Sequence, residues 1–208
     1  MREGFLIAAG YLLGSLPWGY WLPLALKRVD IRTLGSGNVG ATNVWRALGF
    51  KYGLAVALLD ILKGVAAGLL GRYLGGELIG VLAGTAVLIG HWRPLFLGFA
   101  KGGKVVAVTG GVGLAVASVA SLAACGLWVI VFLATRYASI ASLAGGTSMP
   151  LFAVAMGVSW PVLGFTIGAA LAIVYLHRGN IARLVRGEER RINVSLRAWV
   201  RGRREASA

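Results

Sequence analysis

The chain has 208 residues, of which 58% are hydrophobic and only 13% are charged, and its mean hydropathy is +0.78. Soluble domains carry about 25% charged residues, so this composition excludes an ordinary soluble protein and indicates an integral membrane protein. The net charge of +14 does not indicate a nucleic-acid partner, because the basic residues lie between and after apolar segments, where an anionic lipid surface accounts for them.

Seven apolar segments follow one another along the chain, and most approach the roughly 20 residues that a helix needs to cross a bilayer. They are 4–26, 52–71, 78–98, 105–118, 120–135, 139–157 and 159–176. We predict an all-α integral membrane protein with seven transmembrane helices, some of them short or broken. Residues 1–192 form its single membrane domain, and residues 193–208 form a basic cytoplasmic extension.

The division between the fourth and fifth segments depends on length. One helix over 105–135 would be about 46 Å long at 1.5 Å per residue, which is too long for one span. We therefore place a turn at Ser118 to Ser121. Prolines in or beside the spans predict kinks and breaks. They are Pro17, Pro23, Pro94, Pro150 and Pro161.

The distribution of Lys and Arg predicts the orientation. The first segment has no convincing small-residue cleavage site, so we interpret it as an uncleaved span. If the N-terminus is outside, Arg2 and Arg72 lie outside and Lys63 lies within a span, whereas every other Lys and Arg lies inside. The positive-inside rule then places the C-terminus in the cytoplasm.

The segment 35–46, GSGNVGATNVWR, is too polar to face lipid, where unsatisfied backbone groups cost several kcal/mol each. Glycines that permit positive φ let successive N–H groups point at one place and form an anion nest. Arg46 adds a guanidinium that matches phosphate geometry. The candidate binding residues are Gly35, Ser36, Gly37, Asn38, Gly40, Thr42 and Asn43. The alternative is a turn that only closes on itself. GSGNVG matches a dinucleotide-binding pattern, but no strand precedes it, so we reject that interpretation.

A second glycine-rich basic loop lies within 90–104, GHWRPLFLGFAKGGK. Lysine binds phosphate as a point charge, and paired glycines let the backbone approach a ligand. The candidate binding residues are His91, Lys101, Gly102, Gly103 and Lys104. The alternative is that the lysines only anchor the chain at the membrane surface.

Two more polar groups fall on the same side in this topology. Ser139 and Ser142 begin the sixth segment, and His177 and Asn180 follow the seventh. His177 is a candidate base or hydroxyl-orienting group, although a lone terminal histidine is more often an interface residue. The convergence of four polar groups predicts one shared site that faces the cytoplasm and binds a phosphorylated ligand.

Other polar residues limit the chemistry. Asp60 and Lys63 are one turn apart in the second span, and we interpret them as a structural ion pair. Two histidines without a carboxylate cluster give no metal-binding set, so we predict no metal and no cofactor. There is no GxSxG elbow and no Ser, His and acid set, which argues against a covalent acyl-enzyme. These residues alone leave both an enzyme and a transporter open.

Several motifs resemble a known family. They are GSLPWG at 14–19, GSGNVGATNVWRALG at 35–49, LLDILKG at 58–64, GHWRPLFLGF with KGGK at 90–104, and HRGNIARLVRGEE at 177–189. In this order, over roughly 5–192, they resemble the acyl-phosphate-dependent glycerol-3-phosphate acyltransferases of bacterial inner membranes, the PlsY family. The resemblance implies seven spans, a cytoplasmic site, and the substrates acyl phosphate and glycerol 3-phosphate. It implies transfer of the acyl group to the first-position hydroxyl, giving lysophosphatidic acid and phosphate.

The resemblance also implies roles for individual residues. Ser36, Arg46 and Lys104 would hold phosphate and stabilise charge in the transition state. His177 and Asn180 would position the glycerol moiety. The base would be a substrate phosphate, with His177 as the alternative. Further contributions are implied at Asn38, Thr42 and Asn43, which shape the nest, and at Ser142, a donor.

The chain departs from the family pattern after the second loop. The family continues GGKGVAT, whereas this chain reads GGKVVAV, so Val105 replaces a glycine and Val108 a threonine. Valine does not readily adopt positive φ and adds bulk beside Lys104. Ala100 is inserted before the loop. A divergent or non-catalytic relative therefore stays open, as does a transporter or binding protein for a phosphorylated solute, although we find no inverted repeat. Acyl-chain preference and oligomeric state also stay open.

Overall fold

The structure is a computed structural model that describes residues 1–192, so the predicted extension 193–208 lies outside the described residues. Within residues 1–192 all regular structure is helical. The elements are α1 (Arg2–Gly14), α2 (Trp18–Lys27), η1 (Ile31–Thr33), α3 (Ala41–Leu48), α4 (Phe50–Gly75), α5 (Glu77–Trp92), η2 (Leu95–Leu97), α6 (Val106–Val116), α7 (Ser118–Thr135), α8 (Ala138–Ala155), α9 (Trp160–Leu176) and α10 (Arg178–Val185).

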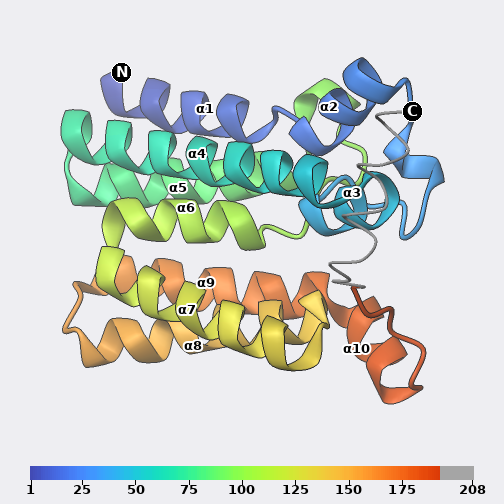
Figure 1. Ribbon diagram of the computed structural model, residues 1–208. Helices are drawn as coiled ribbons and strands as arrows, with labels where there is room; N and C mark the ends of the chain where they lie inside the picture. The colour runs from blue at the N-terminus through green and yellow to red at the C-terminus, as the bar shows by residue number, and fades with distance from the viewer. Residues whose placement is uncertain (193–208) are drawn as a thin grey trace.

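The long helices lie side by side in two groups (Figure 1). The first group contains α1, α4, α5 and α6, and the second contains α7, α8 and α9. The short helices α2, α3 and α10 all lie at one end of the bundle. Four segments are long and apolar enough to cross a membrane, and the number rises to six if each of two bent helix pairs is one span. This confirms the prediction of an all-helical membrane protein.

The first predicted span is broken rather than continuous. α1 and α2 meet at 41°, with the break at Ser15–Pro17. Proline has no N–H to donate and disfavours helical backbone in the residue before it, which explains the position of the break. The ammonium of Lys63 donates to the carbonyls of Gly14 and Leu16 at 3.0 Å each, so backbone acceptors released by the break are satisfied inside the protein.

The predicted turn at Ser118 to Ser121 is displaced by a few residues. The chain leaves the helix at Ala117, and α7 already begins at Ser118. Ser121 lies inside α7, and its hydroxyl donates to the carbonyl of Gly110 at 2.9 Å. A serine that bonds to a neighbouring helix is compatible with a helical position, so serine composition alone misplaced the turn.

The third predicted span, 78–98, agrees with a candidate span over Glu77–Leu97, but the helix within it is interrupted. α5 stops at Trp92, two residues before Pro94, and the short helix η2 follows. Since the residue before a proline avoids the α region, Arg93 leaves the helix with φ −128 and ψ 77. The chain after Trp92 therefore leaves the helix axis and leads into the second glycine-rich loop.

Glycines bring the helices of the first group into backbone contact. A Cβ atom at Gly64 of α4 would lie 2.5 Å from the carbonyl oxygen of Val108, and one at Gly111 of α6 would lie 2.1 Å from that of Ile61. α1 approaches α5 equally closely. Because helices in lipid gain little from the hydrophobic effect, close packing through small residues is what holds such pairs together. This packing fixes α6, the helix that directly follows Lys104.

The predicted ion pair between Asp60 and Lys63 is confirmed. Lys63 Nζ lies 2.9 Å from Asp60 Oδ1, and both side chains are about 3% exposed. The same ammonium lies 2.9 Å from His91 Nδ1, which is itself 3.6 Å from the carboxylate. The cluster joins α4 to the end of α5 and to the break after α1. Its role is therefore structural support beneath the second loop.

Candidate functional site

The first glycine-rich loop runs into the N-terminus of α3. Gly35 and Gly37 adopt φ of +62 and +66, the left-handed conformation that was predicted from the glycine pattern. Gly40 is different, with φ −91, but a Cβ atom there would lie 2.8 Å from Asn38 Oδ1. The glycines thus shape the turn and permit close packing.

Asn43 holds this loop from within. Its Oδ1 accepts a hydrogen bond from the N–H of Ser36 at 3.0 Å, and its Nδ2 donates to the carbonyls of Ile31 and Leu34 at 3.2 and 3.0 Å. Ser36 itself is exposed and Thr42 is half-buried. Asn43, which was expected both to shape the nest and to bind substrate, is therefore engaged in shaping the loop, whereas Ser36 is exposed.

Asn38 joins the first loop to the second. Its Oδ1 accepts from the N–H of Gly40 at 2.9 Å, and its Nδ2 donates to the carbonyl of Gly102 at 3.0 Å, 64 residues away. The side chain is 7% exposed. The two loops predicted to share a site therefore lie against each other, and Asn38 is the buried link between them.

The second loop folds back onto the end of α5. Gly102 N–H donates to the Trp92 carbonyl at 2.9 Å, and Gly103 N–H donates to the His91 carbonyl at 3.0 Å. A Cβ atom at Gly103 would lie 1.9 Å from His91 Nε2. His91 and the two glycines are thus packing residues that fix the loop. Lys101 is exposed and Lys104 is half-buried.

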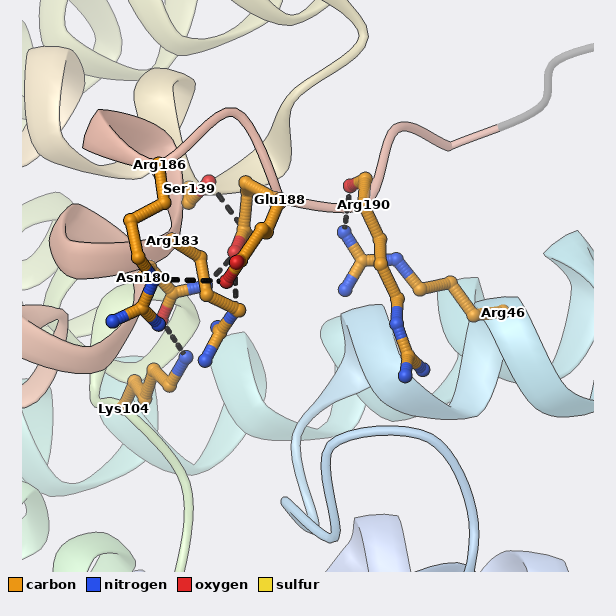
Figure 2. Close-up of polar contacts among 9 residues, drawn as sticks. Arg46, Lys104, Ser139, Asn180, Arg183, Arg186, Glu188 and Arg190 are labelled. Carbon is orange, nitrogen blue, oxygen red and sulfur yellow. Dashed lines mark hydrogen bonds and ion pairs between the residues drawn. The ribbon is translucent and has the colours of Figure 1, made fainter.

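A polar network connects Lys104 to α10 and α8 (Figure 2). Lys104 Nζ donates to Asn180 Oδ1, and Asn180 Nδ2 donates to Glu189 Oε1 at 2.7 Å. Ser139 Oγ donates to the same carboxylate oxygen at 3.0 Å, and Arg183 Nε donates to Glu189 Oε2 at 2.7 Å. Side chains from three distant parts of the chain therefore form one connected site.

Glu189 and Arg183 are residues of this network that the sequence analysis did not name as site residues, and Glu189 is the one that links the others. Glu189 is 7% exposed, although it lies in the highly charged segment after α10. Partial burial raises the pKa of its carboxyl, but hydrogen bonds from Asn180, Arg183 and Ser139 lower the pKa below its ordinary value. The sequence did offer a signal for this residue. Glu188 and Glu189 end the last family-like motif and are carboxylates within a segment that is otherwise rich in arginine.

Arg46 enters the site from α3. Its Nη2 donates to the backbone carbonyl of Arg190 at 2.7 Å, as Figure 2 shows. Its Nε is buried and has no hydrogen-bond partner within the described residues. A buried donor without a partner is costly, and an anion would satisfy it.

Burial also affects the charge of Lys104. Burial and the positive charge of Arg183 together lower the pKa of its ammonium to about 8, although Glu189 opposes the shift. Near neutral pH the group is mostly protonated, but its charge is poorly compensated. An arriving phosphate would supply the missing negative charge.

Two other predicted residues are held in place by neighbours. His177 is 4% exposed, and its Nδ1 lies 2.8 Å from the carbonyl of Ile173. A carbonyl can only accept, so Nδ1 carries the proton and a neutral ring leaves Nε2 as an acceptor. Ser142 Oγ accepts from Trp128 Nε1 at 3.2 Å, and its own proton remains available to a donor role.

An apolar cavity of about 520 Å³ lies beside this polar site, between α5 and α9. It extends from Leu78 and Pro161 to Trp92 and Leu176, and Val105 lines it next to Lys104. The other lining residues are Val81, Leu82, Thr85, Leu88, Ile89, Gly164, Phe165, Gly168, Ala169, Ala172 and Tyr175. Its volume is in the range of small-molecule sites. A charged site at the end of an apolar cavity suits an amphiphile with an anionic head.

Comparison with known proteins agrees with this geometry. The sequence pattern of the family described as "Glycerol-3-phosphate acyltransferase" matches residues 4–187. A protein of that name from Desulforudis audaxviator is 44% identical over 187 residues, which are 90% of this chain and 94% of the relative. One from Aquifex aeolicus is 45% identical over 193 residues, covering 92% of this chain and all of the relative.

Two crystal structures of PlsY, described as an integral membrane glycerol 3-phosphate acyltransferase, are similar in fold. Its glycerol 3-phosphate form has a TM-score of 0.88 and 42% identity, and its lysophosphatidic acid form has 0.84 and 40%. Each match covers 93% of this chain and 96% of the other. The resemblance stated from the motifs is thereby confirmed. The chain belongs to the PlsY family of integral membrane glycerol-3-phosphate acyltransferases, and its activity is that of a glycerol-3-phosphate acyltransferase.

Proposed function

We propose that the chain transfers a fatty acyl group from acyl phosphate to the first-position hydroxyl of glycerol 3-phosphate, giving lysophosphatidic acid and phosphate. The observation that carries this proposal is that Val105, which lines the apolar cavity between α5 and α9, directly follows Lys104 in the chain. An acyl chain in the cavity would present its carboxyl carbon to the cationic network. The relatives with bound glycerol 3-phosphate and lysophosphatidic acid support the same ligands here.

We place the site on the cytoplasmic face of a bacterial inner membrane. Seven crossings, formed by the α1–α2 pair, α4, α5, α6, α7, α8 and α9, would leave the N-terminus outside and α3 and α10 inside. α6 has 11 residues and is only about 16 Å long. Arg72, predicted to lie outside, donates to the Ala115 carbonyl at 3.0 Å near the end of α6, which supports a charged outer boundary there.

In this proposal Arg46, Lys104 and the first glycine-rich loop bind phosphate. The half-buried Lys104 and the unpartnered Nε of Arg46 are donors that an anion would satisfy. Ser36 lies exposed on the same loop and contributes its hydroxyl. As negative charge develops on the acyl carbonyl oxygen and on the leaving phosphate, these cations stabilise it more than they stabilise the ground state.

The reaction needs no covalent intermediate on the protein. The glycerol hydroxyl oxygen attacks the acyl carbonyl carbon, and the bond from that carbon to the phosphate oxygen breaks with its electron pair. The hydroxyl proton passes to the departing phosphate, so atoms and charge balance. Asn180 and His177 orient the glycerol moiety, and Nε2 of His177 is the alternative base. An acyl phosphate is a mixed anhydride, so a weak oxygen nucleophile suffices.

Phosphate release by the purified protein tests the proposal. We expect release from palmitoyl phosphate that depends on glycerol 3-phosphate and matches lysophosphatidic acid formation one for one. Palmitoyl thioesters should not replace the acyl phosphate. R46A should lower kcat/KM by about 100-fold or more, as expected for loss of a charged contact in the transition state. Equal release without glycerol 3-phosphate, or equal use of thioesters, would refute the proposed reaction.

A further inference from the structure

The segment that follows α10 crosses the site as a strap, which we define as Gly187–Ile192. Its last residue is firmly anchored. Ile192 is 2% exposed and packs in one cluster with Phe132 and Ala138 at the junction of α7 and α8. Its N–H donates to the carbonyl of Arg136 at 2.9 Å. Burial of an isoleucine side chain in this cluster fixes the end of the strap.

Between its ends the strap contacts the site through two residues, Glu189 and Arg190 (Figure 2). Glu189 accepts hydrogen bonds from α8 and α10, and the Arg190 carbonyl accepts the bond from Arg46 Nη2 at 2.7 Å. Arg190 and Arg191 are both exposed. The backbone of the strap, rather than its basic side chains, therefore reaches α3.

A carbonyl partner suits an anion-binding arginine. Arginine loses about 2 kcal/mol of rotamer entropy when its side chain is fixed, so a preformed contact saves that cost at binding. A carboxylate in the same place would neutralise the guanidinium, whereas the Arg190 carbonyl orients it and leaves its full charge for a ligand. The buried Nε of Arg46 is then still free to donate.

We infer that Ile192 is a positioning residue for acyl transfer, because its buried side chain holds the strap so that the Arg190 carbonyl orients Arg46. This inference depends on the proposed phosphate-binding role of Arg46. Ile192 touches no substrate, and its effect passes through the backbone to the guanidinium.

The test compares I192A with V185A in the full chain. Val185 is 83% exposed on α10, so V185A removes an aliphatic side chain without touching the strap. We expect I192A to lower kcat/KM by about 10- to 100-fold, since small displacements of positioning groups have effects of that size. I192V should stay near the wild-type rate, and V185A should be unchanged.

A double-mutant cycle separates positioning from general damage. If the strap acts through Arg46, I192A adds little to R46A, and the two losses are far from additive. Full additivity, or full activity of I192A in folded protein, would overturn the role of Ile192. An active R46A would instead overturn the proposed role of Arg46, so the two failures are distinguishable.

A second pair of variants remains informative if I192A does not fold. R190A removes the side chain but keeps the backbone dihedral angles of residue 190 restricted. R190G makes the same backbone flexible, and with it the carbonyl that accepts the hydrogen bond from Arg46. We expect R190G to be about 3-fold or more slower than R190A in kcat/KM at equal melting temperature. Equal rates for R190A and R190G would contradict positioning by the strap.

Discussion

Lys104 shows how burial tunes a single residue for binding an anion. Its pKa of about 8 results from burial and from Arg183 nearby, so the ammonium loses its proton just above physiological pH. A bound phosphate would favour the charged form and raise this pKa again. The free enzyme and the substrate complex should therefore differ in their pH dependence.

The pH dependence is a direct prediction. We expect kcat/KM to fall as pH rises through about 8, because free enzyme with neutral Lys104 binds phosphate poorly. kcat at saturating substrate should fall only at higher pH. In K104R the decrease of kcat/KM near pH 8 should disappear, because arginine keeps its proton throughout this pH range. An unchanged decrease in K104R would assign the titration to another group.

Val105, which stands where the motif resemblance implies a glycine, adopts a backbone conformation that is typical of glycine. It is 2% exposed and adopts φ +59 as the residue before α6, the left-handed conformation that a glycine adopts without strain. For a β-branched residue this conformation costs about 1–2 kcal/mol. The path of the second loop is thus maintained at the expense of strain, which argues against a collapsed site.

The strain at Val105 is measurable against a matched position. Val108 is fully buried in the first turn of α6, at a helical position where glycine costs up to about 0.5–1 kcal/mol. V105G and V108G both lose a buried valine side chain, but only V105G relieves strain. We expect V105G to be more stable than V108G by roughly 2 kcal/mol in thermal or denaturant unfolding. Equal losses in the two variants would show that Val105 is not strained.

At the scale of elements, close helix contact determines where the second loop can lie. α6 packs on α4 with Gly111 against the Ile61 carbonyl, and α6 begins immediately after Val105. A change in the distance between these helices would move Lys104 relative to Asn180.

This contact predicts unequal effects of two glycine substitutions. G111A places a methyl carbon only 2.1 Å from the Ile61 carbonyl oxygen, so we expect a loss of about 2 kcal/mol or more together with lower activity. G126A on α7 meets nothing within 4 Å and should be neutral or slightly stabilising. Melting curves and rates of the two proteins check this. Similar melting temperatures would mean that α4 and α6 can separate without cost.

The sequence predicted the elements better than their contacts. Each long helix of the described residues was predicted from the length of an apolar segment. This worked because the thickness of the bilayer's hydrocarbon core sets the length that a spanning helix needs. The turn near Ala117 was misplaced, because serine composition was a poor guide there. The resemblance implied that Asn38 and Asn43 shape the nest, but their partners were not predictable, because these are backbone groups placed by the fold. Glu189 was missed for a similar reason, since its burial depends on the chain turning back after α10.

At the scale of the whole molecule, the short helices and both glycine-rich loops gather at one end of the bundle. Orientation in the membrane then decides which compartment supplies the polar substrate. The positive-inside rule predicts the cytoplasm, where most of the basic loops would lie.

Single cysteines test this orientation. Cys125 is the one cysteine of the chain, so C125A provides a background for Y73C and V185C, whose native residues are 88% and 83% exposed. Tyr73 lies near the end of α4 away from the site, and Val185 lies on α10. A membrane-impermeant maleimide should label Y73C in spheroplasts and V185C only in inverted vesicles. The reverse pattern would place the site outside.

The most direct test of the proposed site is an experimental structure of this protein with lysophosphatidic acid bound. We expect the phosphate within hydrogen-bond distance of Arg46 or Lys104 and the acyl chain between α5 and α9, passing Val105. A chain bound on another face of the bundle, or a phosphate that touches neither cation, would contradict the proposed site.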